Sequence, residues 1–210
     1  MLVLGLDTST PAVSVALVRR GAETLAEHVV VDGKRHGELL AVGIETVLSR
    51  AGVDRRDLGA VAVGLGPGPF TGLRVGIVTA AALADALGIP AYGVCSLDAL
   101  GEGARVAVTD ARRREIYWAR YDAGGQRVEG PAVSAPVDVL ALWQGIPVVG
   151  DGAVVHAEAL SGLDLRSEPR YPSAARLAGL AVAGGSRVLT PMYLRRPDAV
   201  APGLPKRVTP

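Results

Sequence analysis

The segment that most constrains this fold is a glycine- and proline-rich loop at residues 64–76, with the sequence GLGPGPFTGLRVG. It follows an apolar run at 60–65 that has the length and composition of a buried strand. It leads into an apolar, alanine-rich stretch that ends near Leu87, where Gly88 and Pro90 are typical helix stop signals. A strand, a tight loop and a helix in this order predict an α/β unit, and such loops often bind phosphate.

The residues around this loop predict three successive strands, followed by helices and strands in alternation. The expected strands are 2–6, 12–18, 24–31, 60–65 and 91–95, and the expected helices are 36–50, 72–87 and 96–101. This order is typical of a mixed sheet covered by helices. We therefore assign residues 1–101 to a first lobe.

The second half of the chain predicts a smaller lobe at 102–204. Its expected strands are 105–110, 115–121, a strand near 128 and 147–150, and its expected helices are 137–143, 155–160 and 171–184. The basic, proline-containing end at 205–210 is predicted to be a disordered tail.

Composition argues against several classes of protein. The formal net charge is only +1, with basic residues spread along the chain, which disfavours an extended nucleic-acid footprint. The sequence shows no run of about 18 apolar residues and no signal-like start, so a cytoplasmic location is expected. The single cysteine, Cys95, lies in an apolar run and is expected to be buried.

Metal and hydrolytic chemistry are not expected. The three histidines, His28, His36 and His156, have no histidine four residues away and no cysteine partner, so the spacing does not fit a zinc site. The sequence also lacks a Gly-x-Ser-x-Gly elbow. We assign no catalytic residue and no metal ligand.

The residues leave two interpretations of the glycine- and proline-rich loop. It lacks the lysine of a P-loop and the spacing of a dinucleotide fingerprint, which favours a structural turn over a phosphate site. Thr71 is predicted to cap the helix that follows. Arg74, in the first turn, opposes the helix dipole unless an anion meets it.

Small residues recur along the helix behind the loop, with Gly72, Gly76, Ala80 and Ala84 at four-residue spacing. A glycine inside a helix costs about 1 kcal/mol relative to alanine, so Gly76, and Gly43 in the earlier helix, indicate a close approach by another segment. That segment belongs either to the same chain or to a partner.

The turn after the first strand carries Asp7, Thr8 and Ser9. These side chains could hold a magnesium-bound nucleotide, with the carboxylate near the metal and the hydroxyls near phosphate. They could equally form an Asx turn that starts a hairpin.

A second polar cluster, Arg112, Arg113 and Arg114, lies in a predicted hairpin turn. Such runs usually form solvated surface. The alternative is a contact with an RNA phosphate.

Four segments together resemble the bacterial TsaB (YeaZ) proteins, which are also described as glycoprotease-like or M22 peptidase homologues. The segments are 4–9, 66–74, 110–112 with 115–117, and 193–195. They occur in the family's order along nearly the whole chain. Pro69 stands where that family usually has serine, which stiffens the turn and removes a hydroxyl.

This resemblance implies an α/β, actin-like ATPase (ribonuclease H-like) fold of two related lobes with mixed five-stranded sheets, the second lobe reduced. It also implies a non-catalytic subunit of the bacterial machinery that forms N6-threonylcarbamoyladenosine at position 37 of tRNAs reading codons that start with A. In that family, TsaB scaffolds and activates the catalytic paralogue TsaD together with the ATPase TsaE.

Further expectations come from the same resemblance. Asp7, Thr8 and Ser9 would be a vestigial nucleotide loop, with no cofactor beyond weak ATP or ADP binding, mainly in the complex. The protein would contact tRNA only through the complex. An independent actin-like nucleotide phosphohydrolase or kinase is the alternative function, and a peptidase is disfavoured.

The resemblance also places a pairing surface, for TsaD or for a second copy of the chain in a homodimer, on the two glycine-bearing helices. The candidate residues are Leu39, Gly43, Val47, Gly72, Val75, Gly76 and Thr79. Gly76→Leu is predicted to prevent pairing while the monomer stays folded.

Overall fold

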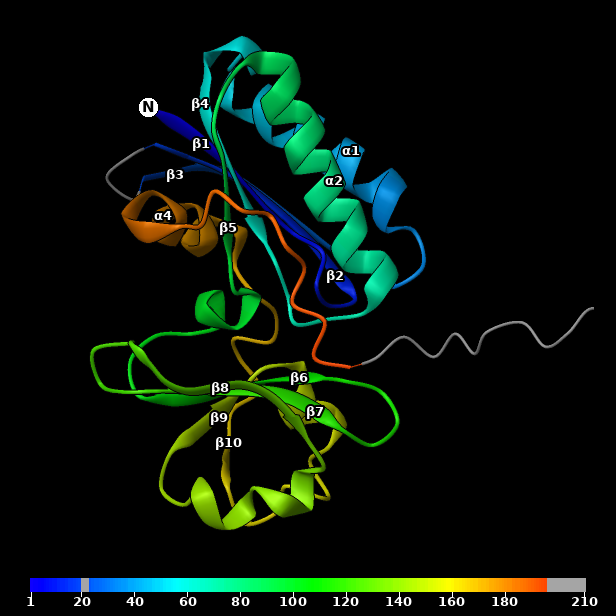
Figure 1. The fold of residues 1–210 in the computed structure, drawn as a ribbon, viewed down its shortest axis with the longest axis vertical. Helices are drawn as coiled ribbons and strands as arrows, with labels where there is room; N and C mark the ends of the chain where they lie inside the picture. Colours follow the sequence, from blue (N-terminus) through cyan, green and yellow to red (C-terminus); the bar gives the residue numbers. More distant parts are fainter. Residues whose placement is uncertain (20–22, 196–210) are drawn as a thin grey trace, which may run out of the picture.

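The computed structural model describes residues 1–19 and 23–195, which form two lobes stacked end to end (Figure 1). Each lobe is built on a five-stranded sheet. The predicted tail at 205–210 lies outside the described residues.

The first sheet has the strand order β3-β2-β1-β4-β5. The elements of this half are β1 (Leu2–Asp7), β2 (Ala12–Arg19), β3 (Glu23–Val31), α1 (His36–Ala51), η1 (Arg55–Asp57), β4 (Leu58–Gly64), α2 (Phe70–Leu87), β5 (Ala91–Val94) and the 3-10 turn η2 (Ser96–Ala99). Strand β1 pairs antiparallel with β2 and parallel with β4, which confirms the predicted mixed sheet. Apart from the unforeseen turn η1, the elements follow the predicted order, with small shifts at their ends.

The second sheet has the order β10-β9-β6-β7-β8. Its strands are β6 (Arg105–Asp110), β7 (Ile116–Tyr121), β8 (Arg127–Ser134), β9 (Pro147–Val149) and β10 (Asp164–Leu165). Read from β8, this order repeats that of the first sheet, with β6 in the place of β1. The expectation of two related lobes is confirmed.

Two helices predicted in the second lobe are wrong. Residues 137–143 form two 3-10 turns, η3 (Pro136–Asp138) and η4 (Leu140–Leu142), and the helix expected at 155–160 is instead α3 (Asp151–Val155). Packing sets the conformation of the first segment, because the fully buried Trp143 lies with its ring 5.3 Å from that of Trp118. So short a segment gains too little from helical hydrogen bonds to outweigh such a contact.

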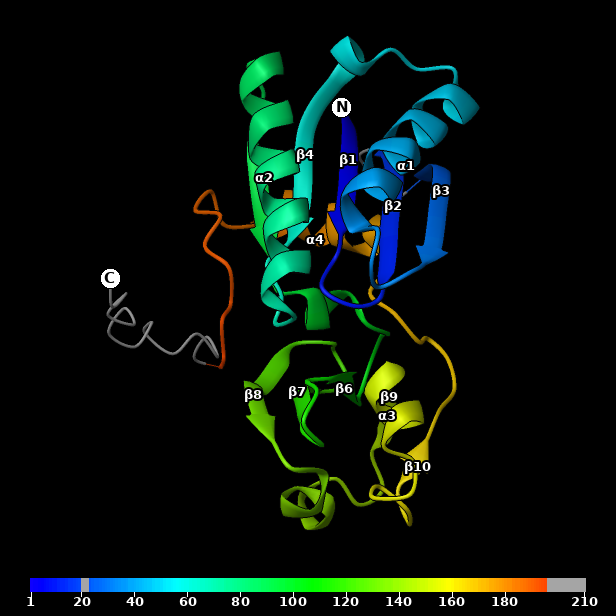
Figure 2. The same ribbon diagram turned by 90° about the vertical axis from the view of Figure 1, so that its right-hand side faces the viewer.

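Helix α4 (Ala174–Gly184) corrects the assignment of 102–204 to one lobe, because this helix packs on the first sheet. It covers the face opposite α1 and α2, as both ribbon views show (Figure 2). Gly5 of β1 makes the approach possible, since a Cβ there would lie 2.1 Å from the carbonyl oxygen of Ala174. The first sheet is therefore covered by helices on both faces.

Helix α2 is 18 residues long and apolar enough to cross a membrane by length and composition alone. This differs from the expectation that no segment reaches that length. Gly72, Leu73, Gly76, Ile77, Ala80 and Ala84 are buried, and α2 packs on β4 of its own lobe. A core helix of a water-soluble protein passes the same test.

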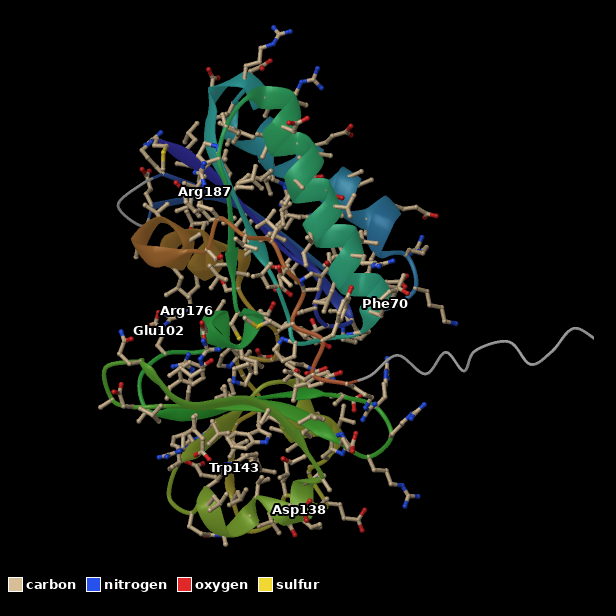
Figure 3. All side chains as sticks on the ribbon, viewed as in Figure 1. Phe70, Glu102, Asp138, Trp143, Arg176 and Arg187 are labelled. Carbon is tan, nitrogen blue, oxygen red and sulfur yellow. The ribbon has the colours of Figure 1, made fainter. Side chains whose placement is uncertain are left out.

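The two lobes are held together by buried and charged contacts at their junction. The buried side chain of Arg105 donates hydrogen bonds to the carbonyl oxygens of Leu100, Gly103 and Asp98. Arg176 of α4 pairs with Glu102, and Figure 3 shows the two side chains together between the lobes. Residues 186–195 then return from the first lobe to the second.

Candidate functional site at the junction of the lobes

The Asp7 turn is satisfied from within the chain. Ser9 donates two hydrogen bonds to Oδ1 of Asp7, from its amide at 2.9 Å and its hydroxyl at 2.7 Å, and Ser96 Oγ donates to Oδ2 at 2.6 Å. Burial raises the pKa of Asp7 above its ordinary value, while the hydrogen bonds from Ser96 and Ser9 oppose that shift. Both carboxylate oxygens therefore already have partners.

Thr8 is engaged in the same way. Its hydroxyl donates to the carbonyl oxygen of Gly72 at 2.7 Å and accepts from the amide of Gly76 at 3.1 Å. Asp7, Thr8 and Ser9 are all at most 2% exposed. The arrangement matches the Asx-turn interpretation, with the loop and the start of α2 lying over the turn.

The small residues of α2 face the interior of the chain. A Cβ on Gly72 would lie 2.6 Å from the carbonyl oxygen of Thr8, and one on Gly76 would lie 2.5 Å from its hydroxyl. Gly43 of α1 faces β2 and β3, since its Cβ would lie 2.9 Å from Val15 and 3.2 Å from His28. The close approach predicted from the glycines exists, and it is internal.

This packing uses four of the seven predicted interface residues inside the chain. Gly43, Val47, Gly72 and Gly76 are buried within the chain itself, so their part in pairing stays a prediction. Leu39, Val75 and Thr79 are half-buried and stay predictions. We now expect Gly76→Leu to disturb the monomer itself, because a larger side chain has no room beside Thr8.

The outer faces of the same two helices are apolar and exposed. Val42 of α1 is 53% exposed and Val78 of α2 is 63% exposed, and Ala41, Ala81 and Ala82 are exposed beside them on the same helices. The helices lie side by side on one face of the sheet (Figure 1).

The start of α2 differs from the prediction. The capping position is Pro69 rather than Thr71, and among the residues that the structure describes no side chain caps the helix. Arg74 lies with its guanidinium 4.1 Å from the ring centre of Phe70, which itself stacks on Tyr193 at 5.1 Å. Figure 3 shows Phe70 at the end of α2 that faces the second lobe.

A pocket of about 250 Å³ lies beside Phe70, between the lobes. It is lined by Gly68, Pro69, Phe70, Asp110, Ala111, Arg112, Arg113, Tyr117, Tyr193 and Arg195. Arg112 and Arg113 of the predicted RNA-contact cluster line it, and Arg114 is not among its lining residues. Arg195 donates to the carbonyl oxygen of Ala111 at 2.9 Å and pairs with Glu115, which fixes residues 186–195 to the β6–β7 turn.

Asp110, Asp151 and His156 form a polar cluster next to this pocket. His156 Nε2 lies 3.0 Å from Asp110 Oδ1, and the amide of Asp110 donates to Asp151 at 3.4 Å. Burial raises the pKa of Asp151 to about 6. In the sequence, His156 has no histidine or cysteine partner. The packing of α3 on β6 brings it to Asp110, which lies 46 positions away along the chain.

Gly150 and Gly152, on either side of Asp151, pack on β6. A Cβ on Gly150 would lie 2.0 Å from the carbonyl oxygen of Val108, and one on Gly152 would lie 2.6 Å from a methyl group of the same residue. Among the described residues, no group of three or more His, Cys, Asp or Glu side chains could hold a metal ion.

Comparisons with known proteins agree with these features. Residues 27–185 match the family model described as TsaD, tRNA N6-adenosine threonylcarbamoyltransferase. An uncharacterized protein of Mycobacterium tuberculosis H37Rv is 50% identical over 202 residues, covering 94% of this chain and 93% of that protein. The Escherichia coli K12 tRNA threonylcarbamoyladenosine biosynthesis protein TsaB is 38% identical over 129 residues, which are 58% of this chain and 55% of that protein.

The structure of YeaZ from Pseudomonas aeruginosa superposes with a TM-score of 0.77 at 31% identity, covering 92% of this chain and 99% of that chain. Two mixed sheets with the same strand order, meeting at a junction pocket, define an actin-like (ribonuclease H-like) protein of two lobes. Within that class, the chain belongs to the TsaB (YeaZ) family, a branch of the glycoprotease-like proteins that the TsaD model describes.

Proposed function

We propose that this chain is the non-catalytic subunit of a bacterial machinery that forms N6-threonylcarbamoyladenosine at position 37 of tRNAs reading codons that start with A. In this proposal it pairs with a TsaD-type catalytic subunit, which it scaffolds and activates together with the ATPase TsaE. Alone it forms a homodimer, and it works in the cytoplasm without a resident cofactor. The similarity to the E. coli tRNA threonylcarbamoyladenosine biosynthesis protein TsaB supports the pathway.

The observation that carries the pairing is the exposed apolar face of α1 and α2. Val42 and Val78 are 53% and 63% exposed, on two helices that lie together on the outside of the first sheet. Only a third of the α2 residues are buried, although the helix is among the most apolar parts of the chain. An apolar helix face of this kind is typical of a protein interface.

The Asp7 turn supports a non-catalytic role. A carboxylate that served a nucleotide-bound metal would need oxygen lone pairs turned toward the ligand. Both oxygens of Asp7 instead accept hydrogen bonds, one from Ser9 and the other from Ser96. For the alternative, an independent phosphohydrolase or kinase, a nucleotide would first have to reach Asp7, which is only 1% exposed.

The test is co-expression of this chain with TsaD- and TsaE-type partners, followed by measurement of the modified nucleoside in tRNA. Val78→Glu should weaken pairing with the catalytic partner by about tenfold or more, because it buries a charge in an apolar contact. Val137→Glu is the matched control, since Val137 is 65% exposed in the second lobe.

Modified tRNA formed equally well without this chain would overturn the proposal. ATP turnover by the isolated chain, fast enough to account for the chain's effect on tRNA modification, would also overturn the proposal. Equal pairing by the Val78→Glu variant and the wild type would remove the α1–α2 face from the proposal.

A further inference from the structure

A second cavity shares two lining residues with the junction pocket. A cavity of about 260 Å³ lies between the starts of α1 and α2 and is lined in part by Lys34, His36 and Thr71. Pro69 and Arg112 line both this cavity and the pocket beside Phe70. We call these two adjacent cavities together the junction groove.

Four basic side chains line the junction groove, although the net charge of the chain is only +1. They are Lys34, Arg112, Arg113 and Arg195, of which Arg195 is paired with Glu115, and Asp110 is the one acidic lining residue in the part of the chain that the structure describes. Asp110 is already held by His156 at 3.0 Å and by Arg112 at 3.2 Å. Because the Arg112 side chain is still 69% exposed, it remains accessible to an anion in the groove.

Aromatic side chains gather on one wall of the same groove. Phe70 is the chain's only phenylalanine, and it is 45% exposed although most of the large apolar side chains are buried. Tyr193 stacks on it and is 39% exposed, and Tyr117 lines the same pocket. Exposed rings beside cationic side chains are the combination that binds unpaired bases together with their phosphates.

The backbone of the β6–β7 turn is strained at the groove. Arg112, Arg113 and Arg114 all have positive φ, at 61°, 53° and 61°. For residues with side chains this left-handed conformation costs about 1–2 kcal/mol each. Bonds from the Ala111 amide to Glu115 and from the Arg112 amide to Asp110 hold the turn in place. Strain of this kind concentrates at binding sites, where it fixes side chains in position.

We propose that the junction groove binds a single-stranded segment of RNA. Lys34 and Arg112 contact successive phosphates, and an unpaired base packs against the exposed edge of the Phe70–Tyr193 pair. The inference rests on the proposed function only for the kind of RNA, namely the anticodon loop of a tRNA. It gives this chain a direct RNA contact, beyond what the catalytic partner supplies.

The test uses a fluorescently labelled 17-nucleotide anticodon stem-loop and the full chain, alone and with its catalytic partner. Binding is followed by fluorescence anisotropy at several salt concentrations. Arg112→Gln should weaken binding and lower the salt dependence by about one phosphate contact. Phe70→Leu should weaken binding about tenfold with the salt dependence unchanged, because it removes the aromatic pair whose exposed edge the base packs against.

Arg56→Gln is the charge-matched control, since Arg56 is exposed in η1 of the first lobe and outside the groove linings. A fully paired RNA duplex and free ATP are the competitors, and neither should displace the stem-loop at equal concentration. Equal effects of Arg56→Gln and Arg112→Gln, or equal binding of the duplex, would overturn the inference.

The outcomes separate this inference from the proposed function. If tRNA modification depends on this chain but the groove variants bind RNA like the wild type, only the inference that the junction groove binds RNA is refuted. Groove-dependent RNA binding without any modified nucleoside would refute the proposed function alone. Displacement by ATP at low concentration would show a nucleotide pocket instead and would also refute the inference.

Discussion

At the scale of single residues, Asp151 lies buried beside the amide of Asp110 and carries a charge that the fold does not favour. Burial raises its pKa to about 6 from an ordinary value of 3.8. The folded chain thus binds the proton more tightly than the unfolded chain, so Asp151 supports stability below about pH 4 and this support is lost as the pH rises through 6.

Asp151→Asn should therefore raise the free energy of unfolding by about 2 kcal/mol at pH 7 and change it little at pH 4. The amide oxygen can still accept the hydrogen bond from Asp110. Urea unfolding at both pH values measures the difference, with Asp138→Asn, an exposed carboxylate of the same lobe, as control. An equal change in the free energy of unfolding at both pH values would contradict the raised pKa of Asp151.

Gly76 shows how a glycine can be required by one neighbouring atom. A Cβ would lie 2.5 Å from Thr8 Oγ1, so Gly76→Leu should destabilise the chain by about 3 kcal/mol or more. Gly179 of α4 is the matched control, because it is exposed and a Cβ there meets nothing within 4 Å. Gly179→Ala should stabilise by about 0.5–1 kcal/mol in the same urea titration, through its better helix propensity.

At the scale of elements, the sequence predicts what each segment forms better than where it packs. The first-lobe strands and helices follow from apolar runs, glycine turns and stop signals such as Gly88. The partner of α4 does not, because a helix with one apolar face fits either sheet, and the deciding contact is between Gly5 and Ala174. The sequence does not show what packs on the small residues of α2 for the same reason. Their spacing places them on one face of the helix, but it does not identify the segment that this face contacts.

Helix α4 also offers an element-scale prediction. Ser173 caps it by accepting a hydrogen bond from the amide of Arg176 at 3.3 Å. Ser173→Ala should cost about 1 kcal/mol of stability, measured by thermal unfolding. Ser161→Ala, an exposed serine in a turn, should stay within about 0.5 kcal/mol of the wild type. A Ser173→Ala variant as stable as the wild type would show that the cap contributes nothing.

At the scale of the whole molecule, the junction decides whether the lobes unfold together. Arg105 donates to three backbone oxygens there, so Arg105→Met should destabilise the junction by about 3 kcal/mol. Both tryptophans, Trp118 and Trp143, belong to the second lobe, so their fluorescence reports that lobe while circular dichroism reports both.

The two signals should follow one transition in the wild type and separate in the Arg105→Met variant. Arg120→Met is the control, because Arg120 pairs with Glu129 on the partly exposed side of β7 and β8 and should change stability little. Coincident transitions in Arg105→Met would show that other contacts couple the lobes.

The return of residues 186–195 from the first lobe to the second has a kinetic consequence. Backbone hydrogen bonds from Ser186 to Gly93 and from Met192 to Leu65 hold this segment to the first lobe. The Arg195 side chain, which donates to the carbonyl oxygen of Ala111, holds it to the second lobe. An actin-like pair of lobes tied in this way cannot swing open without breaking those bonds. A ligand of the junction groove should therefore associate in a single fast step, near 10⁵–10⁷ M⁻¹s⁻¹, with no slow closing phase after the encounter.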